Sequence, residues 1–332
     1  MRKKILYILL EIFLFITILL NYIAYNDAYK FTHFAKVKES TIKISDTSPI
    51  NLRQKLKYIL FGVDVPRPEN NLKPSFDYET VIIPTQKGKL ELWVSDKQDT
   101  IGTVILFHGY ANKKSSLKSR AAEFFKLGYN VVMVDFLGSG GSDGNTTSIG
   151  YYEAEQVKAC YDFAKAKGEK NIYLFGISMG SVAIMKFVKD NHPDLKGIIL
   201  ECPFGNFKTT VKKRFKNFGI PTFPMADLLM LWGSYQSGYW IYGHNPVDYA
   251  KDINCPTLLL YGEWDHAVSR KEIDDMYNNL KGEKTLKVFK RTNHEIYRDL
   301  NSKEWVDAIK LFLTETGTYN EPVLNVPQFH VY

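Results

Sequence analysis

A serine between two glycines is the strongest chemical feature of this sequence. Ser178 lies at the centre of Gly-Ile-Ser-Met-Gly, residues 176–180. Residues 172–175 are apolar and predict a buried strand, and residues 181–189 predict a helix. Strand, sharp turn and helix are the context in which G-x-S-x-G forms a nucleophile elbow. The pentapeptide alone leaves a second interpretation open, a glycine-rich turn with an incidental serine.

The chemistry of an elbow explains the two glycines. So tight a turn strains the backbone of Ser178, and side chains at Gly176 and Gly180 would collide with the neighbouring strand and helix. The helix that follows points its first N–H groups at the place where an oxyanion would form. The spacing therefore predicts a nucleophilic serine.

A serine hydroxyl needs a base to take its proton, and the base needs an acid to fix its tautomer. Asp265 follows the predicted strand 257–261, and His294 follows the predicted strand 285–290. The order Ser…Asp…His along the chain is one of the known orders of a catalytic triad. We therefore predict that Ser178 is the nucleophile, His294 the general base and then acid, and Asp265 its orienting carboxylate.

The elements that must position these residues alternate along the chain. Predicted strands cover residues 103–107, 130–135, 172–175, 195–200, 257–261 and 285–290, and predicted helices cover residues 117–127, 150–167, 181–189, 269–280 and 302–313. Such alternation predicts a parallel sheet with helices on both faces. Right-handed crossovers bring the carboxyl ends of the strands to one edge, where ligands bind. A hairpin is predicted just before, at residues 79–84 and 89–95.

Residues 203–250 interrupt this rhythm and are rich in aromatic residues and glycine. One interpretation is a cap or lid that covers an apolar substrate at the sheet edge. The other is a helical excursion that only packs on the core. The sequence leaves both open.

With these features the chain resembles the α/β-hydrolase superfamily, in particular its monoacylglycerol-lipase-like and serine-aminopeptidase-like group. The resemblance spans residues 78–315 and rests on His108-Gly109, Asp135 with the glycine-rich loop after it, the elbow, the run 255–265 and His294. It implies an α/β-hydrolase fold, a mostly parallel sheet with a cap insertion at residues 203–250. It also implies an oxyanion hole formed by the backbone N–H groups of Met179 and Tyr110.

The identity of the acid has one serious alternative. Glu201 follows the predicted strand 195–200, and some α/β-hydrolases place their acid there. We prefer Asp265, because the run Gly-Glu-Trp-Asp at residues 262–265 matches the commoner position. Glu263, closer to the strand, is expected to turn away. His108, His192 and His266 are expected to make local hydrogen bonds.

Composition and the lack of other motifs exclude several classes of function. The chain has 332 residues, a formal charge of +7 and three cysteines, too few and too scattered for a disulfide scaffold. It has no zinc spacing or RNA-binding motif, so no nucleic acid is expected as a partner. No cofactor or metal is predicted either, since residues 138–144 lack the lysine of a phosphate loop and no G-x-G-x-x-G opens a helix.

The N-terminus predicts a membrane anchor at residues 1–25. Arg2, Lys3 and Lys4 precede an apolar run, residues 5–25, long enough as a helix to cross a bilayer. A cleaved signal peptide, with secretion of the enzyme, and a buried helix of a soluble domain are the alternatives. The basic N-terminus favours a cytoplasmic N-terminus and an extracytoplasmic catalytic domain. Residues 26–77 are expected to be a linker with a short amphipathic helix at 50–61, and residues 316–332 an irregular tail.

We therefore expect a membrane-anchored serine hydrolase that cleaves an ester, thioester or amide through an acyl-enzyme. The anchor and the aromatic insertion favour an acyl ester, either of a lipid or of another small molecule. A peptidase or an acyltransferase on the same triad is the alternative among enzymes. The alternative outside enzymes is a catalytically silent, membrane-anchored binding module. The sequence does not determine the oligomeric state.

Overall fold

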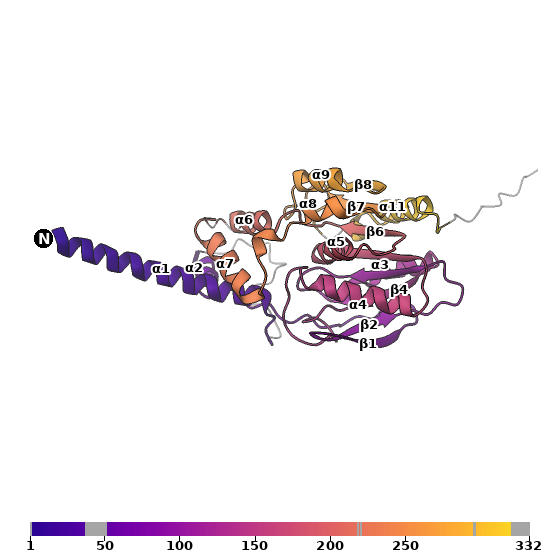
Figure 1. Ribbon diagram of the computed structural model, residues 1–332, viewed down its shortest axis with the longest axis horizontal. Helices are drawn as coiled ribbons and strands as arrows, with labels where there is room; N and C mark the ends of the chain where they lie inside the picture. Colours follow the sequence, from indigo (N-terminus) through magenta and orange to yellow (C-terminus); the bar gives the residue numbers. More distant parts are fainter. Residues whose placement is uncertain (1, 37–51, 218, 220, 295–296, 320–332) are drawn as a thin grey trace, which may run out of the picture.

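The computed structural model describes residues 2–36, 52–217, 219, 221–294 and 297–319. A long N-terminal helix projects from an α/β domain, and the helices of the insertion lie beside the inner end of that helix (Figure 1).

Within the described residues, eight strands form one sheet in the order β1-β2-β4-β3-β5-β6-β7-β8. The strands are β1 (Glu79–Thr85), β2 (Gly88–Val94), β3 (Thr103–Phe107), β4 (Asn130–Val134), β5 (Ile172–Ile177), β6 (Gly197–Glu201), β7 (Thr257–Gly262) and β8 (Lys284–Phe289). All neighbours from β4 to β8 are parallel, whereas β2 is antiparallel to both β1 and β4. The predicted hairpin and the predicted parallel sheet are both confirmed.

Helices cover both faces of this sheet. Alternate side chains of β3 show why: Ile105 and Phe107 pack on one face, and Val104 and Leu106 pack on the other. The first face is covered by α4 (Glu153–Ala166), α5 (Met179–Asn191) and α9 (Arg270–Asn279), and the second by α3 (Lys118–Lys126) and α11 (Ser302–Glu315). Strands buried on both faces need apolar residues throughout, which explains the continuous apolar runs in the sequence.

The interruption predicted between the strands is a set of helices between β6 and β7. It contains α6 (Phe207–Asn217), α7 (Met225–Ser237), η2 (Ile241–Gly243), α8 (Pro246–Tyr249) and η3 (Ala250–Asp252). Ala226, Met230 and Ile241 join the main core, whereas Tyr235 and Trp240 are exposed. The insertion thus packs on the core and also presents aromatic rings outward.

The N-terminal helix α1 (Arg2–Thr32) has 31 residues and extends further than the predicted run 5–25. At 1.5 Å per residue it is about 46 Å long, and by length and composition it is able to cross a bilayer. Its outer part is exposed, whereas Ile23, Ala24 and Ala28 are at most 3% exposed. Ala24 and Ala28 share one helix face, and small residues there let α7 approach closely.

Two hydrogen bonds also join α1 and α7. The indole N–H of Trp232 donates to Oδ1 of Asn21 at 3.1 Å, and the amide of Gln236 donates to the carbonyl of Tyr25 at 2.9 Å. The inner end of the predicted anchor is therefore part of the folded domain.

The segment expected to be a linker is bound to the domain where the structure describes it. After α2 (Leu52–Phe61), the guanidinium of Arg67 donates to the carbonyls of Gly140, Ser142 and Gly144 at 2.5–3.1 Å. These carbonyls belong to the glycine-rich loop after β4, so one arginine satisfies a cluster of backbone acceptors. Residues 37–51 of the expected linker lie outside the described residues.

The start of the expected tail is also bound. Oγ1 of Thr316 lies 2.5 Å from the hydroxyl of Tyr173, and Oγ1 of Thr318 lies 2.7 Å from that of Tyr129. Residues 320–332 lie outside the described residues.

Candidate active site

Ser178 occupies a sharp turn between β5 and α5. Its φ of 50° and ψ of −108° are unusual for a residue with a side chain, and such conformations persist only where the surroundings impose them. Here the backbone N–H of Ser178 donates to the carbonyl of Glu201 on β6 at 2.7 Å. The turn leaves the serine partly exposed above a buried strand.

The two glycines of the elbow are required by close backbone contacts. A Cβ on Gly176 would lie 2.5 Å from the backbone nitrogen of Ser181 in α5. A Cβ on Gly180 would lie 2.5 Å from the carbonyl oxygen of Phe107 at the end of β3. The predicted collisions are confirmed. Because neither glycine has a side chain, the helix and the strands are able to approach closely at the serine.

The structure brings Ser178, Asp265 and His294 together at the carboxyl ends of β5, β7 and β8. Nε2 of His294 lies 3.2 Å from Oγ of Ser178, and Nδ1 of His294 lies 2.7 Å from Oδ2 of Asp265. A carboxylate accepts, so Nδ1 carries the proton and Nε2 faces the serine hydroxyl as an acceptor. This geometry would allow a serine, a base and an acid to act together.

Asp265 is fixed by its own loop. Its Oδ1 accepts the backbone N–H groups of Ala267 at 2.7 Å and Val268 at 2.8 Å, so Oδ2 remains for the imidazole. The hydroxyl of Tyr297 lies 3.4 Å from the same Oδ2. The side chain of Asp265 is fully buried, and that of His294 is 21% exposed. The buried carboxylate thus holds a ring whose other edge reaches the serine.

The other candidate acids face elsewhere. Glu201 is buried, and its carboxylate pairs with the guanidinium of Arg120 and accepts the indole N–H of Trp305 at 3.1 Å. Glu263 is exposed and accepts the backbone N–H of Arg291 at 3.0 Å. The expectation that Glu263 turns away is confirmed.

The two residues predicted to supply oxyanion donors lie on either side of the elbow. Met179 is the first residue of α5, where the N–H groups of a helix have no partner within it. Tyr110 is the third residue after β3, beside which Gly180 packs. Met179 is thus next to the serine, and Tyr110 follows the strand end that Gly180 approaches.

His108 holds the loop between β3 and Tyr110, as expected for a local hydrogen-bonding residue. Its Nε2 accepts the backbone N–H of Phe136 at 3.1 Å, and its Nδ1 donates to the carbonyl of Gly109 at 2.8 Å. Burial lowers the pKa of His108 below its ordinary value, against a smaller opposing effect of Asp135. A neutral ring satisfies both hydrogen bonds.

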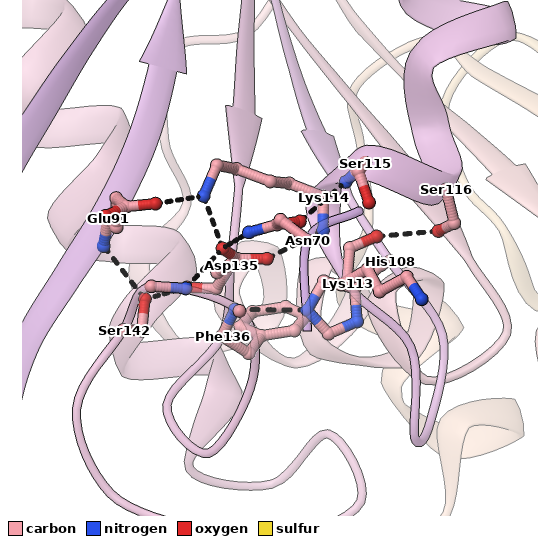
Figure 2. A network of polar contacts seen from close by, with 12 residues as sticks. Asn70, Glu91, His108, Lys113, Lys114, Ser115, Ser116, Asp135, Phe136 and Ser142 are labelled. Carbon is pink, nitrogen blue, oxygen red and sulfur yellow. Dashed lines mark hydrogen bonds and ion pairs between the residues drawn. The ribbon is translucent and has the colours of Figure 1, made fainter. Parts of the chain in front are cut away.

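A buried ion cluster supports the next part of this loop. Lys114 is 0% exposed, and its ammonium pairs with Asp135 after β4 and with Glu91 on β2, the latter at 2.6 Å. Figure 2 shows the Lys114 ammonium reaching between Glu91 and Asp135, with the amide of Asn70 beside them. That amide donates to Oδ2 of Asp135 at 2.6 Å. The cluster ties the segment after α2, two strands and the loop after β3 into one unit.

The Asp135 carboxylate of this cluster is stabilised in its charged form. Burial raises the pKa of Asp135, but the Lys114 ammonium and its hydrogen bonds outweigh burial and leave that pKa below its usual value. The backbone N–H of Lys114 also donates to Oδ1 of Asp135 at 2.7 Å. Each carboxylate oxygen therefore has a donor, as a buried charge requires.

Known proteins match the part of this chain that contains Ser178. The family model described as serine aminopeptidase, S33, matches residues 98–235. The esterase Pf2001 of Pyrococcus furiosus has the same fold, with a TM-score of 0.64 at 24% identity over 75% of this chain and 96% of its own. The chain therefore has the α/β-hydrolase fold.

Two relatives carry the match at the level of sequence. YqkD of Bacillus subtilis (strain 168) is 26% identical to this chain over 228 residues, which are 67% of this chain and 74% of the relative. The lysophosphatidylserine lipase ABHD12 of Macaca fascicularis is 30% identical over 194 residues, 55% of this chain and 46% of the lipase. The match thus spans about half the length of that lipase. The family model and the lipase both describe hydrolases.

Sequence reasoning missed several residues that support the site. Asp135 was noted only as part of the superfamily pattern, and Lys114, Glu91 and Asn70 were not singled out at all. A lysine seven residues after a buried strand looks like a solvated loop residue, because its partners come from distant segments. The glycine-rich loop after Asp135 was the one local indication that this region has a fixed conformation.

Proposed function

We propose that this α/β-hydrolase is a membrane-anchored serine hydrolase that cleaves an acyl ester through an acyl-enzyme on Ser178. The observation that carries the proposal is the bridging position of His294, 3.2 Å from Oγ of Ser178 and 2.7 Å from Oδ2 of Asp265. A thioester or an amide would undergo the same chemistry.

In the first half of the reaction, Oγ of Ser178 attacks the carbonyl carbon while Nε2 of His294 takes the hydroxyl proton. Asp265 stabilises the resulting imidazolium and does not itself accept the proton. The carbonyl oxygen becomes an oxyanion, for which the backbone N–H groups of Met179 and Tyr110 are the donors. The imidazolium then protonates the leaving alcohol, and the ester bond breaks.

In the second half, water replaces the alcohol. His294 takes a proton from the water, which attacks the acyl carbon and forms a second oxyanion in the same place. When this intermediate collapses, the proton returns to Oγ of Ser178 and the carboxylic acid leaves. Atoms and charges balance without a cofactor.

Three observations support a lipid acyl ester as the substrate. Relatives and structural neighbours have lipase or esterase in their names. The insertion presents exposed aromatic rings, Tyr235 and Trp240 among them. Its helix α7 packs on α1, which by length and composition is able to cross a bilayer. An enzyme built in this way would meet acyl chains at the membrane surface.

A peptidase is the second candidate, because the matching family model is described as a serine aminopeptidase. The same triad would also serve an acyltransferase if an alcohol replaced water in the second half. Acyl esters of graded chain length, aminoacyl amides and acceptor alcohols offered to the purified protein separate these activities. Faster turnover of aminoacyl amides than of any ester would favour the peptidase.

The nucleophile is tested by labelling with a fluorophosphonate, which reacts with activated serines. We expect label on the wild-type protein and on Ser302→Ala, a control at an exposed serine that begins α11. We expect none on Ser178→Ala, with ester turnover reduced about 10⁴-fold or more. Undiminished hydrolysis by folded Ser178→Ala would overturn the proposal, and a wild-type protein without label would favour a silent binding module.

We further propose that α1 is an uncleaved anchor with a cytoplasmic N-terminus and an extracytoplasmic catalytic domain. Arg2, Lys3 and Lys4 precede the apolar run, and basic residues favour the cytoplasmic side. The packing of Ala24 and Ala28 against the domain supports retention of the helix over cleavage and secretion. Removal would expose the apolar surface that these residues cover.

A further inference from the structure

The inner end of α1 contacts the loop that carries a proposed oxyanion donor. The hydroxyl of Tyr110 donates to the backbone carbonyl of Phe31 at 2.8 Å. The two rings stack, with centroids 4.9 Å apart and an interplanar angle of 23°. The carbonyl of Phe31 lies in the last turn of α1, where carbonyls lack a partner within the helix. Tyr110 therefore satisfies a carbonyl at the end of the helix, and it belongs to the loop after β3.

The insertion completes this contact. The guanidinium of Arg214, on α6, lies 5.1 Å from the ring centroid of Phe31 and 5.7 Å from that of Tyr110. Burial raises the pKa of Tyr110 above its ordinary value, and nearby Arg214 opposes this only in part. The phenol thus remains a neutral donor at physiological pH. One tyrosine joins the anchor, the loop after β3 and the insertion.

A second contact runs from the same helix end toward Met179. The backbone N–H of Thr147 donates to the carbonyl of Thr32 at 2.9 Å, and that of Phe34 donates to the carbonyl of Asn145 at 2.6 Å. The hydroxyl of Thr147 donates to Glu153 at 2.7 Å and lies 3.4 Å from the sulfur of Met179. The residues that end α1 therefore reach both proposed oxyanion donors, Tyr110 directly and Met179 through Thr147.

We propose that the inner end of the anchor positions the oxyanion hole, and that Tyr110 is a positioning residue through its side chain. The proposal rests on the proposed function. Oxyanion donors act only within about 2.7–3.1 Å of the developing charge, so a donor on a loosened loop loses part of its effect. The hydrogen bond to Phe31 holds the backbone of Tyr110 in place. The rate of hydrolysis then depends on how α1 is seated, besides the access to lipid that the anchor gives.

The test uses full-length protein in detergent and a water-soluble p-nitrophenyl ester, so that access to lipid does not limit the rate. Tyr110→Phe keeps the ring and removes only the hydroxyl that bonds to Phe31. We expect kcat to fall roughly ten-fold, less than the 10²–10³-fold cost of removing a donor outright, with KM and the melting temperature little changed. The matched control is Tyr161→Phe. It removes a hydroxyl on α4 that donates to the carbonyl of Asp194.

A transition-state analogue separates positioning from general damage. A trifluoromethyl ketone adds to the serine and places an oxyanion in the hole, so its affinity should fall by the same factor as kcat in Tyr110→Phe. A variant that is merely less stable would keep the affinity of its folded fraction. Unchanged kcat and unchanged analogue affinity in Tyr110→Phe would overturn the inference. If Ser178→Ala retained hydrolysis, the proposed function would fail instead.

A second pair of variants tests the contact from the helix side, and it decides the question if Tyr110→Phe folds poorly. Phe31→Leu keeps apolar bulk and loses the ring that stacks on Tyr110 and lies beneath Arg214. We expect a several-fold loss of kcat at unchanged KM. Phe13→Leu makes the same change on the exposed outer part of α1 and should match the wild type. Equal kcat in both variants would overturn the inference.

Discussion

The backbone N–H of Ser178 lies 2.7 Å from the carbonyl oxygen of Glu201, the last residue of β6. The hydroxyl of Ser181 lies 3.0 Å from the same carbonyl. The main chain of Glu201 therefore supports the elbow, while its carboxylate pairs with Arg120. Glu201, the alternative acid, thus stabilises the turn at Ser178 through its backbone carbonyl.

These different roles of Asp265 and Glu201 predict opposite effects of two substitutions on kcat and on stability. Asp265→Asn should reduce kcat about 10⁴-fold with little loss of stability, because an amide holds His294 in the wrong tautomer. Glu201→Gln should keep most of the kcat of the folded enzyme. It should nevertheless lower the free energy of unfolding by about 3–5 kcal/mol, because it removes the buried carboxylate charge that pairs with Arg120. Steady-state kinetics and denaturant unfolding measure both. A larger loss of kcat per folded molecule in Glu201→Gln would move the acid to that residue.

The cluster around Lys114 should behave as a buried ion pair. Lys114→Met should cost about 3–5 kcal/mol of unfolding free energy, because it strands the carboxylate of Asp135. The double variant Lys114→Met/Asp135→Leu should cost clearly less than the sum of the single changes. The control, Lys158→Met, breaks a surface pair with Asp162 and should stay within about 1 kcal/mol. Strict additivity in this double-mutant cycle would contradict the pairing.

Acid should destabilise the protein through His244, a fully buried histidine of the insertion. Its Nε2 donates to the carbonyl of Ile149 at 3.0 Å, and its Nδ1 accepts from the hydroxyl of Tyr249 at 2.9 Å. Burial lowers the pKa of His244 from 6.5 to about 4. Below pH 6.5 the unfolded chain binds a proton that the folded chain refuses, so stability falls as the pH falls and levels off below about 4. The full effect is about 3 kcal/mol, at 1.36 kcal/mol per pKa unit.

This pH dependence is measured by denaturant unfolding between pH 7 and pH 4. Because His108 and the carboxylates also titrate, the comparison is with His244→Gln, which lacks the group. In that variant the slope of unfolding free energy against pH should be flatter over this range, by up to the contribution of one proton, which is about 1.36 kcal/mol per pH unit. Identical slopes would contradict a neutral, buried His244.

The membrane prediction has two independent measurements. An uncleaved α1 should keep the enzyme in the membrane fraction after a carbonate wash, and release into the supernatant would rule out the anchor. Protease added to intact cells or spheroplasts should digest the catalytic domain if it lies outside the cytoplasm. Protection until lysis would place that domain in the cytoplasm. A separate measurement concerns the basic residues Lys212 and Lys213 on α6. The affinity of the protein for vesicles of anionic lipid, compared with that of a variant lacking both lysines, tests whether they contact the membrane.

Much of the fold follows from the sequence because the relevant physics is local. A strand covered on both faces must be apolar throughout, so β3, β5 and β7 are visible as short apolar runs. A tight turn before a helix needs glycine, so the elbow is visible as a pentapeptide. Once a parallel sheet is inferred, the carboxyl ends of its strands share an edge, and this predicts that Ser178, Asp265 and His294 lie there.

Other features depend on contacts between distant segments and leave no local pattern. Glu201 ends β6, Asp265 follows β7, and both carry a carboxylate. Only the direction of each side chain decides which one meets His294. The hydrogen bond from Tyr110 to Phe31 joins residues 79 positions apart and ends on a backbone carbonyl, which every residue type possesses. The residue type at position 31 therefore carries no information about that bond. The sequence determined the sheet, the elbow and the order of the reacting groups, whereas the docking of the anchor on the loop after β3 was decided only when the chain packed in three dimensions.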